Sequence, residues 1–365
     1  MSGIRVGARE YENMVSFVGI VYGDIFATGH KPWHPHPENP GRVRRILKSI
    51  IRYGLKNKVK WFRPVKAEKQ DLYSIHAKGY VDYIEKLSQK APAEVDPDTY
   101  VSKDSFETSL YAFGSSIYYG VKAIEDKAIY FVISRPPGHH VGKGGKALNA
   151  PAQGFCLFNN VAGAAKRLID MGVEGILILD FDAHHGNGTQ EIFYDTPKAL
   201  FISIHQEPKT LFPYNSGYPE EIGAGKGEGY NINFPLPPLS GDDCYNVILE
   251  TIDKIAESYD PEIVLVSAGF DGYKADGLTE LFASANTFYR IGSWIRSLGK
   301  PSLIVLEGGY GAGLERGFAG FLSGLIGIDN PVKENETKTL SKVYGNAMKY
   351  VNKTISLINK YWKIK

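Results

Sequence analysis

The sequence predicts an α/β fold built on a largely parallel β-sheet. Eight short apolar runs, rich in β-branched residues and leucine, recur along the chain and have the composition of buried strands. Most of these runs are separated by segments whose apolar residues repeat with the period of a helix. Strands that alternate with helices are typical of βαβ units and a parallel sheet. We therefore expect one α/β domain spanning residues 1–365.

The predicted elements follow from the apolar pattern. Strands are predicted at residues 15–22, 59–62, 129–133, 176–179, 200–204, 230–234, 263–266 and 303–306. The clearest helix lies over residues 43–51, where Val43, Ile46, Leu47, Ile50 and Ile51 share one face. Two further amphipathic helices are predicted over residues 241–259 and 279–298. A last helix, over about residues 337–361, is expected to pack back on a core of about residues 15–330.

Composition narrows the class of protein. The 365 residues are 43% apolar and 22% charged, as in ordinary globular proteins. The 42 Lys and Arg nearly balance the 40 Asp and Glu, so charge gives no reason to expect a nucleic-acid or membrane partner. Two cysteines are too few for a disulfide framework, and neither a signal peptide nor a long apolar span is evident. We expect a soluble, cytoplasmic protein.

Reactive residues follow the predicted strand at residues 176–179. Asp180, Asp182 and His184 stand at positions i, i+2 and i+4, so they lie on one side for as long as the backbone stays extended. Two carboxylates and an imidazole are costly to bury together unless a cation binds them. For this motif alone, a helix cap followed by polar loop residues is an equally good interpretation.

Three other predicted strands also end in reactive residues. They lead into RPPGHH at 135–140, SAGFD at 267–271 and EGGY at 307–310. Because ligands bind outside the carboxyl ends of the strands in open parallel sheets, we expect these motifs on one rim. Packing and helix capping explain a single such motif well, but they explain four together poorly.

These residue types indicate metal-assisted hydrolysis of an amide or related acyl bond. Asp182, His184 and Asp271 can give a metal two oxygens and one nitrogen, and they leave a position open for water and substrate, as in catalytic zinc sites. The same set suits Fe(II) or Mn(II). The histidine pair at 139–140 can act as general acid and base, and the Tyr310 hydroxyl can stabilise a developing oxyanion.

With these motifs in hand, the chain resembles the histone deacetylase superfamily, which includes acetylpolyamine amidohydrolases and acetoin-utilisation proteins. The resemblance covers about residues 15–330. It rests on HPENP at 36–40, RPPGHH at 135–140, GFCLFNN at 154–160, DFDAHHGNG at 180–188, SIH at 203–205, GFD at 269–271 and EGGY at 307–310. It implies the arginase/deacetylase fold, a three-layer α/β/α sandwich around an eight-stranded parallel sheet.

The resemblance also implies a cofactor, a substrate and residue roles. One Zn²⁺ per chain would be held by Asp182, His184 and Asp271, and the substrate would be an acylated lysine side chain or an acetylpolyamine. Catalytic roles would fall to His140 as the general base, His139 paired with Asp180, and Tyr310 as the group that stabilises the tetrahedral intermediate. Substrate-binding positions would be Gly154, which receives the amide N–H, and Phe155 and Phe212, which form the aromatic walls of a tunnel.

Members of this superfamily bind monovalent cations as well, which makes K⁺ an expected second ion. The nearer position would be formed by Asp180, Asp182, His184, Ser203 and Ile204, in part through main-chain carbonyls. The remoter position would be formed by Phe193, Thr196, Ala199 and Tyr230.

Asn187 departs from the pattern of many relatives, which carry an aspartate there. An amide cannot stabilise an imidazolium as a carboxylate does, so the sequence leaves open which histidine is the main base. Asn187 and RPPGHH place the chain near the class II and polyamine-type branch, whose polyamine-type members often dimerise, so a homo-oligomer is one alternative. Tyr310 stands where weakly active relatives have histidine, which favours real deacetylase activity.

Other interpretations remain open at this level. An arginase-like ureohydrolase would use two metal ions on the same fold, and Tyr310 would then have no evident task. A catalytically silent protein that binds acyl ligands would be expected to lack a ligand, a base or the tyrosine. The segment VGKGGKALNAPA at 141–152 is interpreted as a flexible loop, with a part in the tunnel mouth or in a subunit contact as the alternative.

Overall fold

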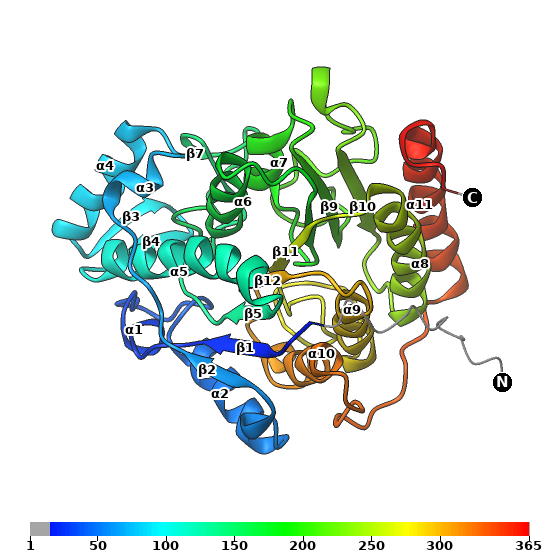
Figure 1. Ribbon diagram of the computed structural model, residues 1–365, viewed down its shortest axis with the longest axis horizontal. Coiled ribbons are helices and arrows are strands. Elements are labelled where there is room, and N and C mark those ends of the chain that lie inside the picture. The colour runs from blue at the N-terminus through cyan, green and yellow to red at the C-terminus, as the bar shows by residue number, and fades with distance from the viewer. Residues whose placement is uncertain (1–14, 365) are drawn as a thin grey trace.

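A computed structural model describes residues 15–364 and has an eight-stranded, all-parallel sheet at its centre (Figure 1). Its strand order is β10-β9-β8-β11-β12-β5-β1-β2. The strands are β1 (Val18–Val21), β2 (Lys60–Phe62), β5 (Ile129–Val132), β8 (Ile176–Asp180), β9 (Ala199–Gln206), β10 (Asn231–Leu236), β11 (Ile263–Ala268) and β12 (Ser302–Leu306). Each coincides with one of the eight apolar runs, so the predicted parallel α/β fold is confirmed.

Helices cover both faces of the sheet, which gives the three layers. Because side chains alternate along a strand, Leu303 and Val305 face one layer while Ile304 and Leu306 face the other. One face packs against α5 (Ser105–Asp126) and α6 (Asn160–Asp170). The other packs against α2 (Gly41–Arg52), α8 (Asp242–Tyr259), α9 (Ala285–Ser297) and α10 (Arg316–Ile326). Burial on both faces explains why the strands are apolar throughout.

The remaining elements complete the described part of the chain. They are α1 (Ile25–Thr28), α3 (Lys69–Leu72), α4 (Lys78–Gln89), the antiparallel pair β3 (Ala93–Asp96) and β4 (Thr99–Val101), the antiparallel pair β6 (Val141–Gly142) and β7 (Gly145–Lys146), α7 (Asn187–Phe193) and α11 (Ser341–Trp362). Three 3₁₀ turns lie at Lys56–Lys58, Gly225–Gly227 and Ala312–Leu314. None of the helices between residues 15 and 364 is long and apolar enough to cross a membrane.

The predicted helices are present, but two begin later than predicted, and one of these is the C-terminal helix, which was expected from about residue 337 and begins at Ser341. The helix predicted over 279–298 begins only at Ala285, because Phe282 and Ala283 form parallel bridges to Gly241 and Tyr273, and Ser284 then caps the helix. The C-terminal helix α11 packs on the edge strand β10, where the Thr354 hydroxyl donates to the Asn233 carbonyl at 2.7 Å.

The interpretation of residues 141–152 as a flexible loop also needs correction. This segment contains the β6–β7 hairpin, and the Glu191 carboxylate accepts hydrogen bonds from the backbone nitrogens of Lys143 and Leu148, both at 3.1 Å. At the hairpin tip, the Lys143 carbonyl accepts from the Ala77 backbone nitrogen at 2.7 Å. The segment is therefore fixed to α7 and to the start of α4.

The strand order places the reactive motifs together. From β8 the chain continues to β9 and β10 on one side, and it returns to form β11 on the other side of β8. The order thus reverses between β8 and β11, and such a switch point opens a crevice at the carboxyl ends of the strands. Asp182 and His184 leave β8 at this crevice, and Asp271 leaves β11.

Candidate active site

Three predicted ligands converge at the carboxyl ends of β8 and β11. The Nδ1 atom of His184 lies 3.0 Å from Oδ1 of Asp182 and 2.9 Å from Oδ2 of Asp271. One ligand atom from each residue lies within 4.8 Å of the other two. Both aspartates are buried, while His184 is partly exposed. The structure thus brings together two carboxylate oxygens and one imidazole nitrogen around a common point.

Backbone groups orient both carboxylates. Oδ2 of Asp182 accepts from the Gly308 nitrogen at 2.6 Å, and Oδ1 of Asp271 accepts from the Ala183 nitrogen at 2.9 Å. Each carboxylate therefore directs its other oxygen toward His184, as the supporting hydrogen bonds of metal sites do. Burial lowers the pKa of His184, but the two carboxylates outweigh this effect and raise it to about 10. The pocket between the aspartates thus favours a positive charge, and its donor set fits Zn²⁺.

Two glycines make room for this cluster. A Cβ atom on Gly269 would lie 2.1 Å from Oδ2 of Asp182. A Cβ atom on Gly308 would lie 2.4 Å from that oxygen and equally close to Oδ2 of Asp271. The sequence showed both glycines within motifs, but nothing in it revealed that they cradle the two carboxylates.

The two neighbouring histidines have different partners. Nδ1 of His139 lies 2.9 Å from Oδ2 of Asp180, whereas Nδ1 of His140 lies 2.7 Å from Oδ1 of Asn187. The two imidazole rings are 4.0 Å apart, and the His140 ring is 5.9 Å from that of His184. The pair therefore lies beside the three ligands.

Asn187 determines which nitrogen of His140 carries the proton. Its Nδ2 donates to the Ala147 carbonyl at 3.0 Å, and a carbonyl can only accept. This contact turns Oδ1 toward His140, so Nδ1 of His140 must be the donor. In the neutral ring, Nε2 then keeps its lone pair and can accept a proton.

The surroundings also separate the pKa values of the two histidines. Burial holds the pKa of His140 well below its usual value, and the neighbouring imidazoles lower it further. Burial lowers the pKa of His139 as well, but Asp180 and Asp182 outweigh it and raise the value to about 10. Near neutral pH, His140 is therefore neutral and His139 is charged.

Tyr310 lies on the loop after β12 and is a neutral donor. Burial raises its pKa well above the usual value, although the nearby Arg42 guanidinium acts in the opposite direction. That guanidinium lies 4.8 Å from the centre of the Tyr310 ring, and its Nε donates to the Gly309 carbonyl at 2.7 Å. Sequence analysis missed Arg42, although a basic residue beside the buried face of the helix at 43–51 was a usable signal.

Half-buried aromatic rings flank this cluster on two sides. The Phe155 ring lies 5.6 Å from that of Tyr310, and the Phe212 ring lies 4.8 Å from that of His140. Between them, Gly154 has a φ of +55°, and a Cβ atom there would lie 2.4 Å from Cδ2 of His140 and 2.8 Å from Cε1 of Phe212. Only glycine fits this close approach. The predicted walls and backbone position are thus neighbours in space.

The residues predicted to bind monovalent cations form two groups beside β9. In the nearer group, Asp180 at the end of β8 pairs in register with Ser203 in the middle of β9, next to Ile204. At the amino end of β9 lie Phe193, Thr196, Ala199 and Tyr230, where the Phe193 carbonyl accepts from the Thr196 nitrogen at 3.3 Å and the Tyr230 carbonyl accepts from the Phe201 nitrogen at 2.9 Å. Both cation positions stay predictions.

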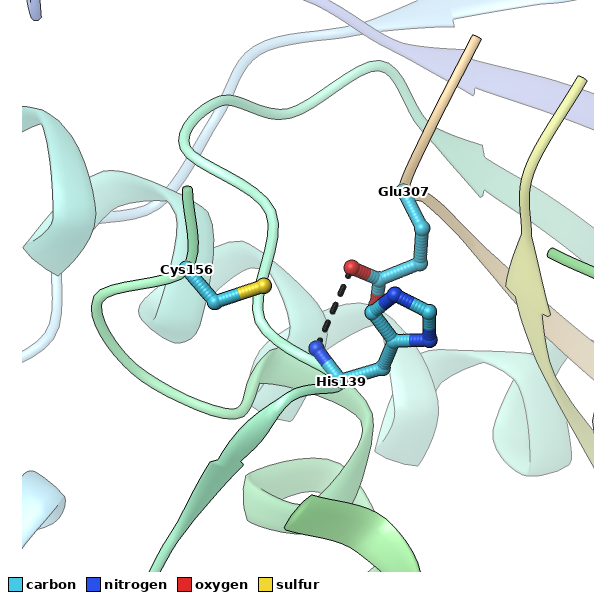
Figure 2. A group of neighbouring side chains, drawn as sticks. All are labelled: His139, Cys156 and Glu307. Atoms are coloured by element: carbon cyan, nitrogen blue, oxygen red, sulfur yellow. Dashed lines mark hydrogen bonds between the residues drawn. The ribbon is translucent and has the colours of Figure 1, made fainter. Parts of the chain in front are cut away.

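A second group, formed by His139, Cys156 and Glu307, has the residue types of a metal site but a different task. Figure 2 shows the Glu307 carboxylate turned toward the backbone nitrogen of His139, at 3.3 Å, and the same oxygen accepts from the Gly138 nitrogen at 2.7 Å. Burial raises the pKa of the Cys156 thiol well above its usual value, so the thiol stays neutral and is a poor ligand. The group fixes the turn that presents the histidine pair.

Comparison with known proteins agrees with this arrangement. Residues 36–325 match the histone deacetylase domain. A probable deacetylase of Archaeoglobus fulgidus is 33% identical, with 94% of this chain and 98% of that protein covered. Acetylpolyamine amidohydrolase 1 of Pseudomonas aeruginosa is 41% identical over 49% of this chain and 50% of its own length. The crystal structure of the HDA15 HD domain superposes with a TM-score of 0.83 at 27% identity, covering 96% of each chain.

Proposed function

The chain belongs to the histone deacetylase family, and from this premise we propose that it is a zinc-dependent amidohydrolase that removes acetyl or related acyl groups from amines. One observation carries the proposal. The Nδ1 atom of His184 and one oxygen each of Asp182 and Asp271 meet beside a neutral His140. Those are the ligands and the base that metal-assisted hydrolysis of an amide needs.

Zinc held by Asp182, His184 and Asp271 would supply a Lewis acid that polarises the acyl carbonyl and acidifies a water molecule. His140 would accept a proton from that water through Nε2, because Asn187 holds its other nitrogen in the protonated form. A bond then forms between the water oxygen and the acyl carbon. When the carbon–nitrogen bond breaks, His140 returns the proton to the leaving amine, so that a carboxylic acid and a free amine result.

Two further side chains would stabilise the negative charge that develops on the acyl oxygen and near it. Tyr310 would donate a hydrogen bond from its neutral phenol to that oxygen, in the manner of an oxyanion hole. His139 would stay protonated beside Asp180 and act through its charge. In this proposal His140 transfers the proton, and His139 stabilises negative charge.

The aromatic walls suggest the shape of the substrate. Phe155 and Phe212 would pack against an unbranched aliphatic chain and exclude water from it, and the Gly154 carbonyl would accept the substrate amide N–H. An acyl-lysine side chain and an acetylpolyamine both have such a chain.

The direct test is a turnover assay with zinc-loaded protein on acetyl-lysine peptides, longer acyl-lysine peptides and acetylpolyamines. We expect release of the acyl group from at least one class. The Tyr310→Phe variant should keep its zinc and lose about 100-fold to 1,000-fold in kcat, as expected when one oxyanion donor is removed. Normal turnover by this variant would contradict the proposed role of the phenol.

Two alternatives predict different results. An arginase-like ureohydrolase would bind two transition-metal ions per chain, whereas this proposal expects one. Among the described residues, the second candidate group uses its carboxylate on backbone nitrogens and holds a neutral thiol, which disfavours a second ion. Failure to hydrolyse any acylated amine despite one zinc per chain would favour a silent acyl-ligand binding protein.

We further propose K⁺ as a second ion and, from the two free cysteines, a cytoplasmic location.

A further inference from the structure

A hollow of about 510 Å³ lies between α4, β3 and the β6–β7 hairpin, outside the cluster described above. Figure 1 shows these three elements together on the side of the molecule away from α11. The hollow, here named the hairpin pocket, is lined by Tyr80, Tyr83, Val95, Gly144, Lys146 and Gln153. It belongs to the segment 141–152, whose purpose the proposed function leaves unexplained.

The rim of the hairpin pocket is basic. Lys146 lines the pocket, and the exposed Lys143 and Lys78 are the sequence neighbours of the lining residues Gly144 and Ala77. Among the described residues Lys143 and Lys146 have no ion pair, whereas the charge of Lys78 already acts on the Asp82 carboxylate one turn along α4. The Nζ of Lys146 donates to the Pro151 carbonyl at 2.9 Å and retains two N–H donors for a ligand. On the floor, the hydroxyl of Tyr80 donates to the Leu157 carbonyl, while Tyr83 is 44% exposed. The pocket therefore has an apolar wall, which includes Tyr83, and lysine amines at its rim that can pair with an anion.

The start of α4 adds to this positive potential. Ala77, another lining residue, occupies the N-cap position, and its side chain cannot accept from the first-turn nitrogens. The first turn of this twelve-residue helix has no acidic residue. No side chain of the first turn therefore offsets the positive end of the helix dipole, which lies beside Lys143 and Lys146.

Two short connections join the hairpin pocket to the candidate active site. Gln153 lines the pocket, and the next two residues are Gly154 and Phe155, so the aromatic wall is at most about 7 Å away along the backbone. The second connection runs through β3, where Val95 lines the pocket. Three residues later, the Asp98 carboxylate accepts a hydrogen bond from the Gly154 nitrogen at the candidate active site. A peptide whose acyl-lysine entered between the walls would carry its neighbouring residues toward this rim.

We propose that the hairpin pocket binds the carboxylate side chain of an Asp or Glu that flanks the acyl-lysine in a peptide or protein substrate. The exposed lysines pair with the carboxylate, and Tyr83 and Val95 contact the aliphatic part of its side chain. This inference rests on the proposed function and narrows its substrate class, because a free acetylpolyamine has no carboxylate to offer.

Binding tests the proposal without turnover. Labelled acetyl-lysine peptides with Glu or Gln beside the acyl-lysine, on either side, are titrated by fluorescence anisotropy into zinc-loaded protein carrying Tyr310→Phe, so that the peptide is not consumed. We expect the best Glu peptide to bind about three- to tenfold more tightly than its Gln counterpart at low salt, from two exposed ion pairs. The preference should shrink in high salt.

The variant Lys143→Glu/Lys146→Glu should abolish or reverse the preference for Glu. A matched reversal on α11, Lys342→Glu/Lys349→Glu, changes the net charge equally, lies on a helix that does not line the pocket and should leave the preference intact. An equal affinity of the unmodified pocket for Glu and Gln peptides would overturn the proposal. If the hairpin variant still binds the Glu peptide more tightly than the Gln peptide, the preference does not arise in the hairpin pocket.

Activity toward a substrate without flanking residues separates this inference from the proposed function. Hydrolysis of a minimal acetyl-lysine amide should be the same with and without the hairpin substitutions when Tyr310 is present. If the protein with Lys143 and Lys146 intact shows no preference for Glu but hydrolyses the minimal substrate normally, the pocket inference alone is contradicted. No turnover of any acylated amine, with a Glu preference still measurable by anisotropy, would contradict the enzymatic proposal alone.

Discussion

Oδ1 of Asn187 faces Nδ1 of His140 at 2.7 Å while the other end of the same amide donates to the Ala147 carbonyl at 3.0 Å. An aspartate at position 187 could not make both contacts, because two acceptors would then face each other. The hairpin segment that supplies the Ala147 carbonyl therefore helps to keep His140 neutral. The amide leaves the pKa of that histidine low, whereas a carboxylate would raise it.

Asn187→Asp should shift the pH dependence of kcat/KM. The new carboxylate would favour the imidazolium form of His140, so the pKa of the base would rise by about 1 to 2 units. Because the base must be neutral to accept a proton, the acidic limb of the profile should move to higher pH by the same amount. A pH series with a minimal substrate measures the shift. An acidic limb at its original position would mean that His140 is not the titrating base.

Much of the fold was predictable because each buried strand is a continuous apolar run. The convergence of Asp182 and His184 was also predictable, since the alternation along an extended chain places them on one side. Their meeting with Asp271 depends on the pairing of β8 with β11, and no local pattern distinguishes that pairing from any other among four strand ends. The hairpin at 141–152 was missed because its anchors, Ala77 and Glu191, are distant in sequence.

Asp271→Ala should lose the metal. The change removes one of the three converging ligand atoms and leaves the Ala183 nitrogen without its acceptor. Zinc binding should weaken by at least about 100-fold, which is the upper range for losing only a supporting contact. Metal analysis of the purified variant measures this loss. Asp276→Asn is a matched control, because Asp276 is also buried nearby but accepts from the Tyr310 and Gly311 nitrogens, and it should retain zinc.

Gly308→Ala should weaken metal binding at the same centre although no ligand residue is replaced. The added methyl group would lie 2.4 Å from oxygens of both Asp182 and Asp271, so one of the carboxylates must move. We expect zinc affinity to fall about 10- to 100-fold, as when a supporting contact of a metal site is removed. Competition with a zinc-binding dye measures it. The control Gly345→Ala, on α11 with no atom near the new methyl group, should keep zinc affinity and stabilise the fold by about 0.5 to 1 kcal/mol.

His76 should make the folded protein sensitive to mild acid. Its Nδ1 lies 2.9 Å from the Gly142 carbonyl, and its Nε2 accepts from the Asn159 nitrogen at 3.0 Å, so a proton on Nε2 would break the second contact. Burial lowers its pKa from 6.5 to about 4 in the folded state. Between pH 6.5 and about 4, His76 is therefore protonated in the unfolded chain but mostly neutral in the folded one. The stability from this group is complete above pH 6.5 and is lost progressively as the pH falls toward 4.

The size of this loss can be measured against a variant that cannot titrate. Between pH 7 and pH 5, the His76 contribution to the free energy of unfolding should fall by about 2 kcal/mol. The other buried histidines contribute equally to the wild type and to His76→Gln, so their effects cancel in the comparison. Urea unfolding at both pH values should show the wild type losing about 2 kcal/mol more than the variant. Equal losses in the two proteins would mean that this imidazole is protonated as readily in the fold as in the unfolded chain, and that the link between β6 and α6 does not depend on its neutral form.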